Sequence, residues 1–481
     1  MVYAAYGIQG LTGIVGTFFV KDYLDLSAEF LAALAFWAGI PWAMKMPVGH
    51  LVDLIWRWKA ALVWLGAAML AASLLIMIGL ISHLEAMRAV MSVNRWFVLA
   101  ALLLPTGYMI QDAVADAMTV EAVPRVDEQG VPYGEQARKE MHTTVQTLGR
   151  IAVIGGLALV AAANIFIFHD TEKFSAAQKA QLYANVYWVA LVIPVISVSG
   201  VVLHRFVRHP AERGESTPPN WWILGGSLAF VALTLAVGLG GLKHAQEIIF
   251  FGSLAVIVFL LWRLARELEP GAREVLVGTA LVLFLYRAVP STGAGTTWWM
   301  IDVLRFDESF LAKLSLVAYA MTLAGMFALR GFMARNSITR IIVVLTLLGT
   351  LLALPNVGMF YGLHEWTAAR TGGMVDARVI ALIDTALESP LGQIAMIPML
   401  AWIANTAPAN LKATYFAVMA SFSNLALAGS QLGTKYLNQA YAVTRGGYGE
   451  VGELMIAVVV IGVALPLAAV AGVRLLKLRT A

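Results

Sequence analysis

Three acidic residues stand in or at the end of an apolar stretch, Tyr108–Glu121. Asp112 and Asp116 are four residues apart, so a helix would present both carboxylates on one face. A carboxylate inside a membrane-spanning helix costs about 3 kcal/mol or more to insert, so such a residue marks a functional position. In this setting a carboxylate can hold a proton or pair with a cation on a neighbouring helix.

The composition places these carboxylates in a membrane protein. Of the 481 residues, 60% are hydrophobic and 13% are charged, and the mean hydropathy is +0.77. A soluble domain carries about 25% charged residues. Apolar runs of roughly 20 residues, enough to span a bilayer, follow one another along the chain. We therefore predict an all-α polytopic membrane protein with about fourteen spans.

The residue inventory argues against several other classes of protein. The chain has no Cys, which excludes disulfides and thiolate metal sites. Its eight His lack paired metal-ligand spacing, so we expect no metal and no cofactor. The sequence has no nucleotide-binding loop of the G-x-x-x-x-G-K-[ST] type, no long basic run and no nucleophile–base pattern. We expect neither an enzyme nor a nucleic-acid-binding protein.

The distribution of positive charge predicts the orientation in the membrane. Lys and Arg are more frequent in the loops on the side of the N-terminus and in the C-terminal tail, as at Arg205, Arg208, Arg474 and Lys477. Cytoplasmic loops carry this excess. Because the predicted number of spans is even, both termini are expected in the cytoplasm. We expect an integral protein of a bacterial inner membrane, surrounded by membrane lipids.

A sequence repeat relates two sets of spans. Residues 17–34 match residues 297–314 at a constant offset of 280 positions. The identical pairs are Thr17/Thr297, Asp22/Asp302, Leu24/Leu304, Phe30/Phe310, Leu31/Leu311, Ala32/Ala312 and Leu34/Leu314. A weaker similarity aligns residues 143–155 with 417–429 and places Arg150 opposite Asn424. Each strong copy is the end of one span, a short outer turn and the start of the next.

The repeat predicts the domain organisation. We expect an N-terminal six-helix half at residues 1–208, an inserted helix pair at 209–272 and a C-terminal six-helix half at 273–481. Two six-helix halves in a parallel repeat are the architecture of the major facilitator transporters, which bind substrate near the midplane between the halves. The fold class is therefore a major facilitator fold with two inserted central helices.

The loop after the second span resembles the major facilitator signature G-x-L-x-D-x-x-x-R-x-[RK]. Gly49, Asp53, Arg57 and Lys59 take its positions, and Trp56 replaces its second Gly. The resemblance implies that Asp53 belongs to a cytoplasmic latch that opens and closes during alternating access.

Short motifs in both predicted halves resemble the folate-biopterin transporter family. They are Tyr6–Gly10, Phe19–Asp22, Pro41–Gly49, Gln111–Glu121, Arg287–Ser291, Gln393–Pro398, Thr414–Ala417 and Ser421–Leu425. His50, Val52 and Met46 depart from the family pattern, and the inserted pair does not take part. The resemblance implies uptake of folates, pterins or related anionic heterocycles with proton coupling. The expected partners are thus a small anionic substrate and protons.

Arg287 is the leading candidate for substrate binding. It lies near the centre of the span predicted at residues 274–299. An Arg at this depth needs a protein carboxylate or an anionic substrate. A carboxylate of the glutamate tail of a folate would suit a bidentate contact with the guanidinium. The alternative is a permanent salt bridge between helices.

Four further residues are candidates for contacts with the heterocycle. Trp42 lies at mid-depth and could stack on it, whereas Gln9, Gln393 and Asn424 could hydrogen-bond it or merely tie helices together. Trp298–Trp299 could also stack, although Trp at a span end is more often part of the aromatic belt at the membrane interface.

Proton coupling or gating is expected of a second group of residues. Arg150 lies at a depth that matches Asp112, so the two can pair, and Asp116 lies about 6 Å nearer the cytoplasm by helical rise. Lys45 either extends to the inner interface or pairs with one of these carboxylates.

A second carboxylate pair lies in the other half. Asp384 and Glu388 are again four residues apart, in the outer part of the span predicted at residues 379–405. We expect one buried carboxylate of the chain to carry the coupling proton.

Two other functions remain open on the same fold. Permeases for cell-wall muropeptides also have a Gln-Asp pair in span four and fourteen spans, but their extra helices lie at the C-terminal end. A membrane scaffold that transports nothing is the other alternative. The glycines at period three, Gly7, Gly10, Gly13 and Gly16, predict close helix packing rather than ligand contacts.

Overall fold

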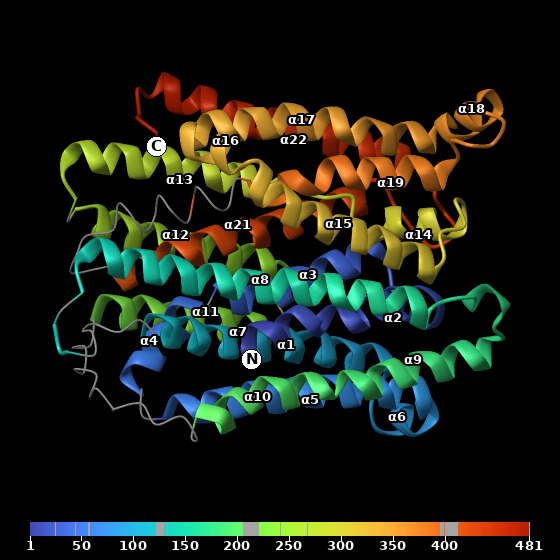
Figure 1. The fold of residues 1–481 in the computed structure, drawn as a ribbon, viewed down its shortest axis with the longest axis horizontal. Coiled ribbons are helices and arrows are strands. Elements are labelled where there is room, and N and C mark those ends of the chain that lie inside the picture. The colour runs from blue at the N-terminus through green and yellow to red at the C-terminus, as the bar shows by residue number, and fades with distance from the viewer. Residues whose placement is uncertain are drawn as a thin grey trace. The chain divides into compact units, whose positions relative to one another are not determined.

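The structure is a computed structural model of the chain, shown as a ribbon in Figure 1. It describes residues 1–24, 26–43, 45–55, 58–121, 129–131, 133–204, 221–240, 242–266, 268–394, 399 and 412–480. Within these ranges the regular elements are helices, and one isolated bridge joins Thr444 to Gly447.

The helices follow one another from end to end of the chain. Up to the predicted insertion they are α1 (Val2–Ile8), η1 (Gln9–Thr12), α2 (Gly13–Tyr23), α3 (Ala28–Ala43), α4 (Lys45–Leu54), α5 (Lys59–Ser82), α6 (Leu84–Val90), α7 (Val93–Glu121), α8 (Glu135–Ile167), η3 (Thr171–Lys173), α9 (Ala176–Ala190) and α10 (Val192–His204). The remainder are α11 (Trp221–Leu239), α12 (Ala245–Ala265), α13 (Pro270–Arg287), α14 (Ala294–Asp302), α15 (Glu308–Ala328), α16 (Arg330–Arg335), α17 (Ile338–Phe360), α18 (Leu363–Arg370), α19 (Ala377–Glu388), η4 (Ser389–Gln393), α21 (Lys412–Ala440) and α22 (Val451–Leu475).

The apolar helices confirm the membrane class predicted from composition. In the described ranges nine helices are long and apolar enough to cross a membrane, and Ala28–Ala43 is a shorter apolar helix. A helix satisfies its own backbone hydrogen bonds, which is why helices are suited to the interior of a bilayer. The count of fourteen spans stays a prediction.

Two predicted spans are interrupted at equivalent positions of the repeat. The first consists of α1, the 3₁₀ turn η1 at residues 9–12, and α2. The span predicted at 274–299 is not one continuous helix, because α13 ends at Arg287 and α14 begins at Ala294. Pro290 has no N–H to donate, and Gly293 has a φ of 74°, which favours glycine. At the offset of 280, residues 9–12 correspond to 289–292.

The chain packs as two compact units, Met1–Phe19 with Pro47–Leu224 and Val20–Met46 with Gly225–Ala481. These boundaries come from packing, whereas the predicted halves follow the sequence repeat, so the three-part division stays a prediction. In the first unit α5 packs against α7 and α1 packs against α8.

Small residues allow a close contact between α5 and α7 in the first unit. A Cβ placed on Gly66 of α5 would lie 2.6 Å from the carbonyl oxygen of Gly107 on α7. Nearby, the fully buried Gln111 donates to the Val63 carbonyl and to the Ser197 hydroxyl, both at 2.9 Å. This amide therefore ties α7 to α5 and α10 by hydrogen bonds.

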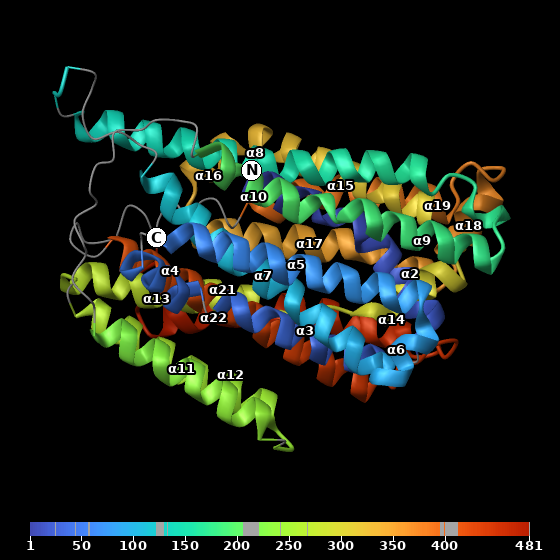
Figure 2. The ribbon, with the colours of Figure 1, turned by 90° about the horizontal axis from the view of Figure 1, so that it is seen from below.

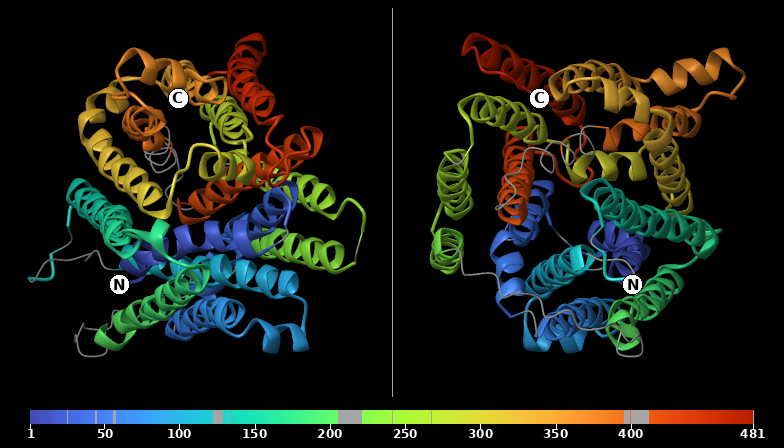
Figure 3. Two further views of the ribbon diagram at one scale, coloured as in Figure 1. Left: turned by 90° about the vertical axis from the view of Figure 1, so that its right-hand side faces the viewer. Right: turned by 60° about the vertical axis from the view of Figure 1, so that its left-hand side comes forward.

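In the second unit α21 is the central packing partner. It contacts α3, α12 and α13. The helices α17, α19 and α22 form another group, seen in orange and red in Figure 3, in which α17 packs against both others.

The helices α11 and α12 of the predicted insertion run side by side in Figure 2. A Cβ on Gly226 of α11 would lie 2.8 Å from the Leu260 side chain of α12. On its other side α12 is anchored by polar contacts: Gln246 donates to the Ala33 carbonyl of α3 at 2.9 Å, and Lys435 of α21 pairs with Glu247 at 3.2 Å.

Gly7 and Gly13 show how differently the glycines at period three are packed, and they test whether these glycines serve close helix packing or ligand contacts. A Cβ on Gly7 of α1 would lie 2.5 Å from the Val153 carbonyl oxygen and 3.0 Å from the Gly156 Cα on α8, whereas a Cβ on Gly13 meets nothing within 4 Å.

We predict that Gly7→Ala lowers the free energy of unfolding by about 1–3 kcal/mol, because the backbone must move to admit the methyl group. Thermal unfolding of the purified protein measures the effect. Gly13→Ala is the matched control, and equal effects of the two changes would contradict the packing interpretation.

Candidate functional site

Arg287 is the last residue of α13, at the edge of the helix break. Its Nε donates to the Ser423 carbonyl of α21 at 3.2 Å, and the side chain is partly buried. Among the residues that the structure describes, no carboxylate lies within salt-bridge distance of this guanidinium. The alternative of a permanent salt bridge therefore gains no support there, and the Nη groups are left to bind another partner.

The break between α13 and α14 is held by one face of α21. Three side chains bind the exposed backbone: Ser430 donates to the Val289 carbonyl (2.7 Å), Thr434 accepts from the Ser291 N–H (2.9 Å), and Asn438 donates to the Thr292 carbonyl (3.1 Å). Because these side chains are four residues apart, they form a stripe along one helix face. Inside a membrane an unpaired backbone group costs several kcal/mol, so this polar stripe fixes where α13 ends.

The polar stripe was missed in the sequence, although two signals were present. Pro290 and Gly293 interrupt an otherwise apolar span, and Ser430, Thr434 and Asn438 recur at period four in a later one. Helix breakers inside a predicted membrane span require polar partners on a neighbouring helix. The two signals together would have predicted the contact.

Arg287 and Trp42 meet α21 at consecutive residues. Arg287 contacts Ser423, and Asn424 donates its Nδ2 to the Trp42 carbonyl at 3.0 Å. Trp42 lies at the end of α3 with its side chain partly buried. Three of the five predicted substrate residues thus lie on or contact one stretch of α21. For Asn424 it shows a hydrogen bond that ties helices, which was one of the two predicted roles.

Gln9 and Gln393 are the remaining substrate candidates. Gln9 is partly buried on η1 in the first unit. The side chain of Gln393, in η4, lies outside the described residues. Trp298 and Trp299 are 1% and 3% exposed, so their assignment to an exposed aromatic belt is wrong. The reason is that α14 packs both indole rings into the core of the second unit.

Asp116 has an unexpected partner in the first unit. The Tyr3 hydroxyl of α1 donates a hydrogen bond to Asp116 Oδ1 on α7. Asp112 and Arg150 both lie near enough to interact electrostatically with the same hydroxyl, and Arg150 is exposed on α8. The structure therefore gathers the predicted carboxylate pair and Arg150 around a tyrosine that the sequence gave no reason to single out. A pairing of Arg150 with Asp112 stays a prediction.

Asp384 is a buried carboxylate of the second unit. It is 5% exposed, and Asn356 of α17 donates a hydrogen bond to its Oδ2. In the described part of the chain its Oδ1 has no hydrogen-bond partner. Glu388 follows one turn later, at the end of α19. The predicted pair thus consists of one enclosed carboxylate and one at a helix end.

Two gating candidates lie on α4. Lys45 is its first residue, and its two predicted roles stay open. Asp53 also belongs to this helix, but its side chain and the residues 56–57 of the signature lie outside the described part of the chain.

The second half of the chain matches a known family. The sequence profile of the BT1 family covers residues 222–475, more than half of the chain. The chain belongs to the BT1 family. A folate-biopterin transporter of Synechocystis sp. is 23% identical over 433 residues, which are 88% of this chain and 71% of the relative. The predicted resemblance to the folate-biopterin transporter family is confirmed.

Solved structures confirm the predicted major facilitator fold of this BT1 family member. A POT family transporter in complex with a thioalcohol-conjugated peptide superposes with a TM-score of 0.66 at 10% identity, covering 98% of this chain and 94% of its own. The nucleoside transporter NupG superposes with a TM-score of 0.55 at 12% identity, covering 98% and 96%. The family and these neighbours are transporters rather than enzymes, and the chain is an integral membrane protein.

Asn438 offers a direct test of the stabilised break. We predict that Asn438→Ala lowers the free energy of unfolding by about 1–3 kcal/mol, because it leaves the Thr292 carbonyl without its side-chain donor. Thermal unfolding with the neighbouring Gln439→Ala as control makes the comparison, since Gln439 is exposed on the same helix. If both variants unfolded alike, the polar stripe would not be what holds the break.

Proposed function

We propose that this protein is a secondary active transporter that moves a small amphipathic organic anion, folate-like or pterin-like, by alternating access. It would act in a bacterial inner membrane with both termini in the cytoplasm. The observation that carries the proposal is Arg287, a partly buried cation whose described surroundings hold no carboxylate. The similarity to the folate-biopterin transporter of Synechocystis supports the class of substrate.

The chemistry of Arg287 favours a carboxylate on the substrate. A guanidinium presents its N–H groups in a planar fork that matches a carboxylate, and such charge-assisted bonds are about twice as strong as neutral ones. Ser423 occupies only the Nε–H. The outer edge of the fork can therefore bind a carboxylate without disturbing the contact that orients it.

A place for the heterocycle follows from the same stretch of α21. Trp42 lies beside Asn424, the residue next to the one that orients Arg287. An aromatic residue and a cation that contact neighbouring residues of α21 suit a ligand with a flat ring and an anionic tail. Gln9 and Gln393 stay predicted candidates for hydrogen bonds to the ring.

Proton coupling is assigned to buried carboxylates. Asp384 offers an enclosed oxygen that no described group occupies, which is a place for one proton. Asp116, with Tyr3 and Asp112 around it, is the corresponding group of the first unit. Arg150, Lys45 and Asp53 are the charged residues that would respond during gating, and Glu388 lies one turn from Asp384.

Substitution of Arg287 tests the substrate anchor. We predict that Arg287→Gln lowers uptake of labelled folate into cells at least about tenfold, since one charge-assisted pair is worth about 1.5–3 kcal/mol. Arg287→Lys should retain part of the activity, because it keeps the charge and loses the fork. Arg88→Gln, an exposed Arg on α6, is the control. Unchanged uptake by Arg287→Gln would exclude the anchor.

Asp384 tests the proton coupling. We predict that Asp384→Asn abolishes accumulation driven by a proton gradient, while exchange of labelled against unlabelled substrate stays within about twofold, because exchange needs no net proton movement. Asp170→Asn, on an exposed loop, is the matched control, and Asp116→Asn examines the carboxylate of the first unit. Gradient-driven accumulation at the wild-type level would remove Asp384 from the mechanism.

The same uptake experiment separates the other functions. Labelled muropeptide offered to the same cells tests the permease alternative, and transport of muropeptide without folate would replace the proposed cargo. Uptake of neither compound, with or without a proton gradient, would favour the scaffold.

A further inference from the structure

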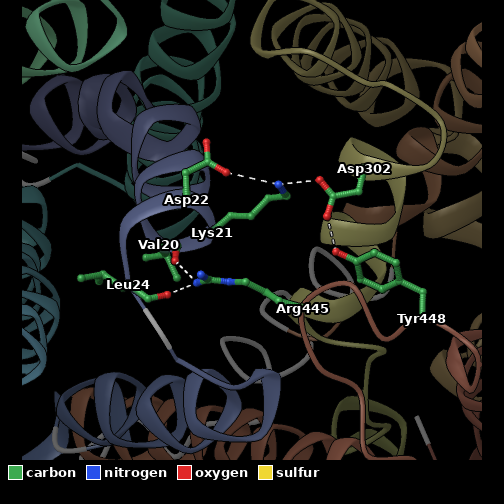
Figure 4. A network of polar contacts seen from close by, with 7 residues as sticks. All are labelled: Val20, Lys21, Asp22, Leu24, Asp302, Arg445 and Tyr448. Carbon is green, nitrogen blue, oxygen red and sulfur yellow. Dashed lines mark hydrogen bonds and ion pairs between the residues drawn. The ribbon is translucent and has the colours of Figure 1, made fainter. Parts of the chain in front are cut away.

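Lys21 joins the two repeat-related aspartates in the second unit. Its Nζ lies 3.2 Å from Asp22 Oδ1 and 2.6 Å from Asp302 Oδ1. Figure 4 shows the lysine between the two carboxylates. Asp22 is near the end of α2 and Asp302 is the last residue of α14. At the offset of 280 these aspartates are equivalent, whereas the equivalent of Lys21 is Ile301. One lysine therefore connects the tips of two related helices.

Arg445 reinforces the same junction. Its Nη2 donates to the Val20 and Leu24 carbonyls at the end of α2. A cation at the C-terminal end of a helix is stabilised by the partial negative charge there. The guanidinium carbon also lies 5.5 Å from the centre of the Trp298 ring on α14. The loop between α21 and α22 is thus attached to both tips.

Tyr448 of the same loop completes the network. Its hydroxyl donates to Asp302 Oδ2, so the two carboxylate oxygens of Asp302 have separate partners. Burial and this hydrogen bond raise the pKa of Tyr448 to about 12. A raised tyrosine pKa preserves the neutral donor, so this contact persists below that pH and is lost only as the pH rises through it.

The helix breaks give these tips a way to move. Both α2 and α14 begin at an interruption of their spans, at residues 9–12 and 288–293. Gly13 at the start of α2 has free space around it, and Gly293 precedes α14. A broken helix concentrates bending at the break.

We propose that α2 and α14 are the two leaves of a gate on the side of the membrane opposite the termini, latched by Lys21 between Asp22 and Asp302 and hinged at residues 9–12 and 288–293. The proposal rests on the proposed function only in taking the protein to be a transporter. In the closed form Arg445 and Tyr448 hold the leaves to the α21–α22 loop. Opening breaks the Lys21–Asp302 pair and the Arg445 contacts with α2.

The asymmetry of the repeat makes this latch sensitive to one residue. Because the repeat equivalent of Lys21 is Ile301, the second copy supplies no lysine at this position. The ammonium of Lys21 therefore pairs with both carboxylates, and no equivalent lysine can replace it. The Lys21 side chain is 11% exposed and that of Asp302 is 37% exposed, so water and salt screen the pair only in part. Loss of the ammonium leaves Asp22 and Asp302 to repel each other.

The absence of native Cys permits a direct test without substrate. Nitroxide labels at Tyr23→Cys and Val303→Cys, both exposed, report the distance between the tips by electron paramagnetic resonance. Lys21→Met and Asp302→Asn should each raise the population with the longer distance about fivefold. Arg88→Met, which breaks the exposed Arg88–Glu85 pair, is the control. Unchanged distances in both latch variants would overturn the proposal.

Two further measurements test its parts. The exchange of charges in Lys21→Asp with Asp302→Lys should restore the short distance, and a protein that stays open would overturn the ion-pair latch. Labels at Val277→Cys and Leu475→Cys, both exposed in the second unit and away from the tips, should keep their distance in the latch variants. A change there as large as that at the tips would overturn the hinge at residues 288–293. None of these results depends on Arg287, so a failed substrate anchor leaves the gate testable.

Discussion

The arrangement of the second unit depends on one constraint, that backbone groups inside a membrane must find their partners within the protein. The span that holds Arg287 breaks this rule locally between α13 and α14, and one face of α21 restores it through Ser430, Thr434 and Asn438. The break sets where α13 ends. Arg287 therefore lies at a helix end with its Nε held by α21. The proposed substrate anchor is a consequence of how the backbone groups of the break are satisfied.

Much of this architecture could be predicted from the sequence. Composition established the all-α membrane class, and short motifs such as Arg287–Ser291 indicated the family, because both depend on residue types and local spacing. The repeat also located Asp22 and Asp302 at equivalent helix ends. These signals depend on residue types and local spacing, and they can be identified without knowing how distant segments pack.

The side-chain partners could not be predicted, since they depend on packing between distant segments. Tyr3 is far from Asp116 in sequence and reaches it because α1 contacts α7. Trp298–Trp299 resembled an interfacial belt, but packing in the second unit buries both rings. The helix breaks were within reach of sequence reasoning, because Pro290 and Gly293 are visible signals. The apolar residues on both sides of them led to the prediction of one continuous span.

The two copies of the repeat have kept their geometry and changed their charges. The first copy has a 3₁₀ turn and the second a helix break near the same place, and each has an aspartate near the end of the following helix, yet only the first has a lysine beside it. This pattern suits a transporter in which one copy supplies the substrate anchor and the other supplies the cation that holds the helix ends together. Equivalent parts of the two repeat copies would then have different roles in transport.

The central claim is that Arg287 binds a carboxylate of the substrate. The most direct measurement is the affinity of the purified wild-type and Arg287→Gln proteins for folate and for biopterin, which has the ring system without the carboxylated tail. The account predicts that the substitution weakens folate binding at least about tenfold and biopterin binding less than about twofold. Equal losses for both ligands would contradict a contact between Arg287 and the carboxylate.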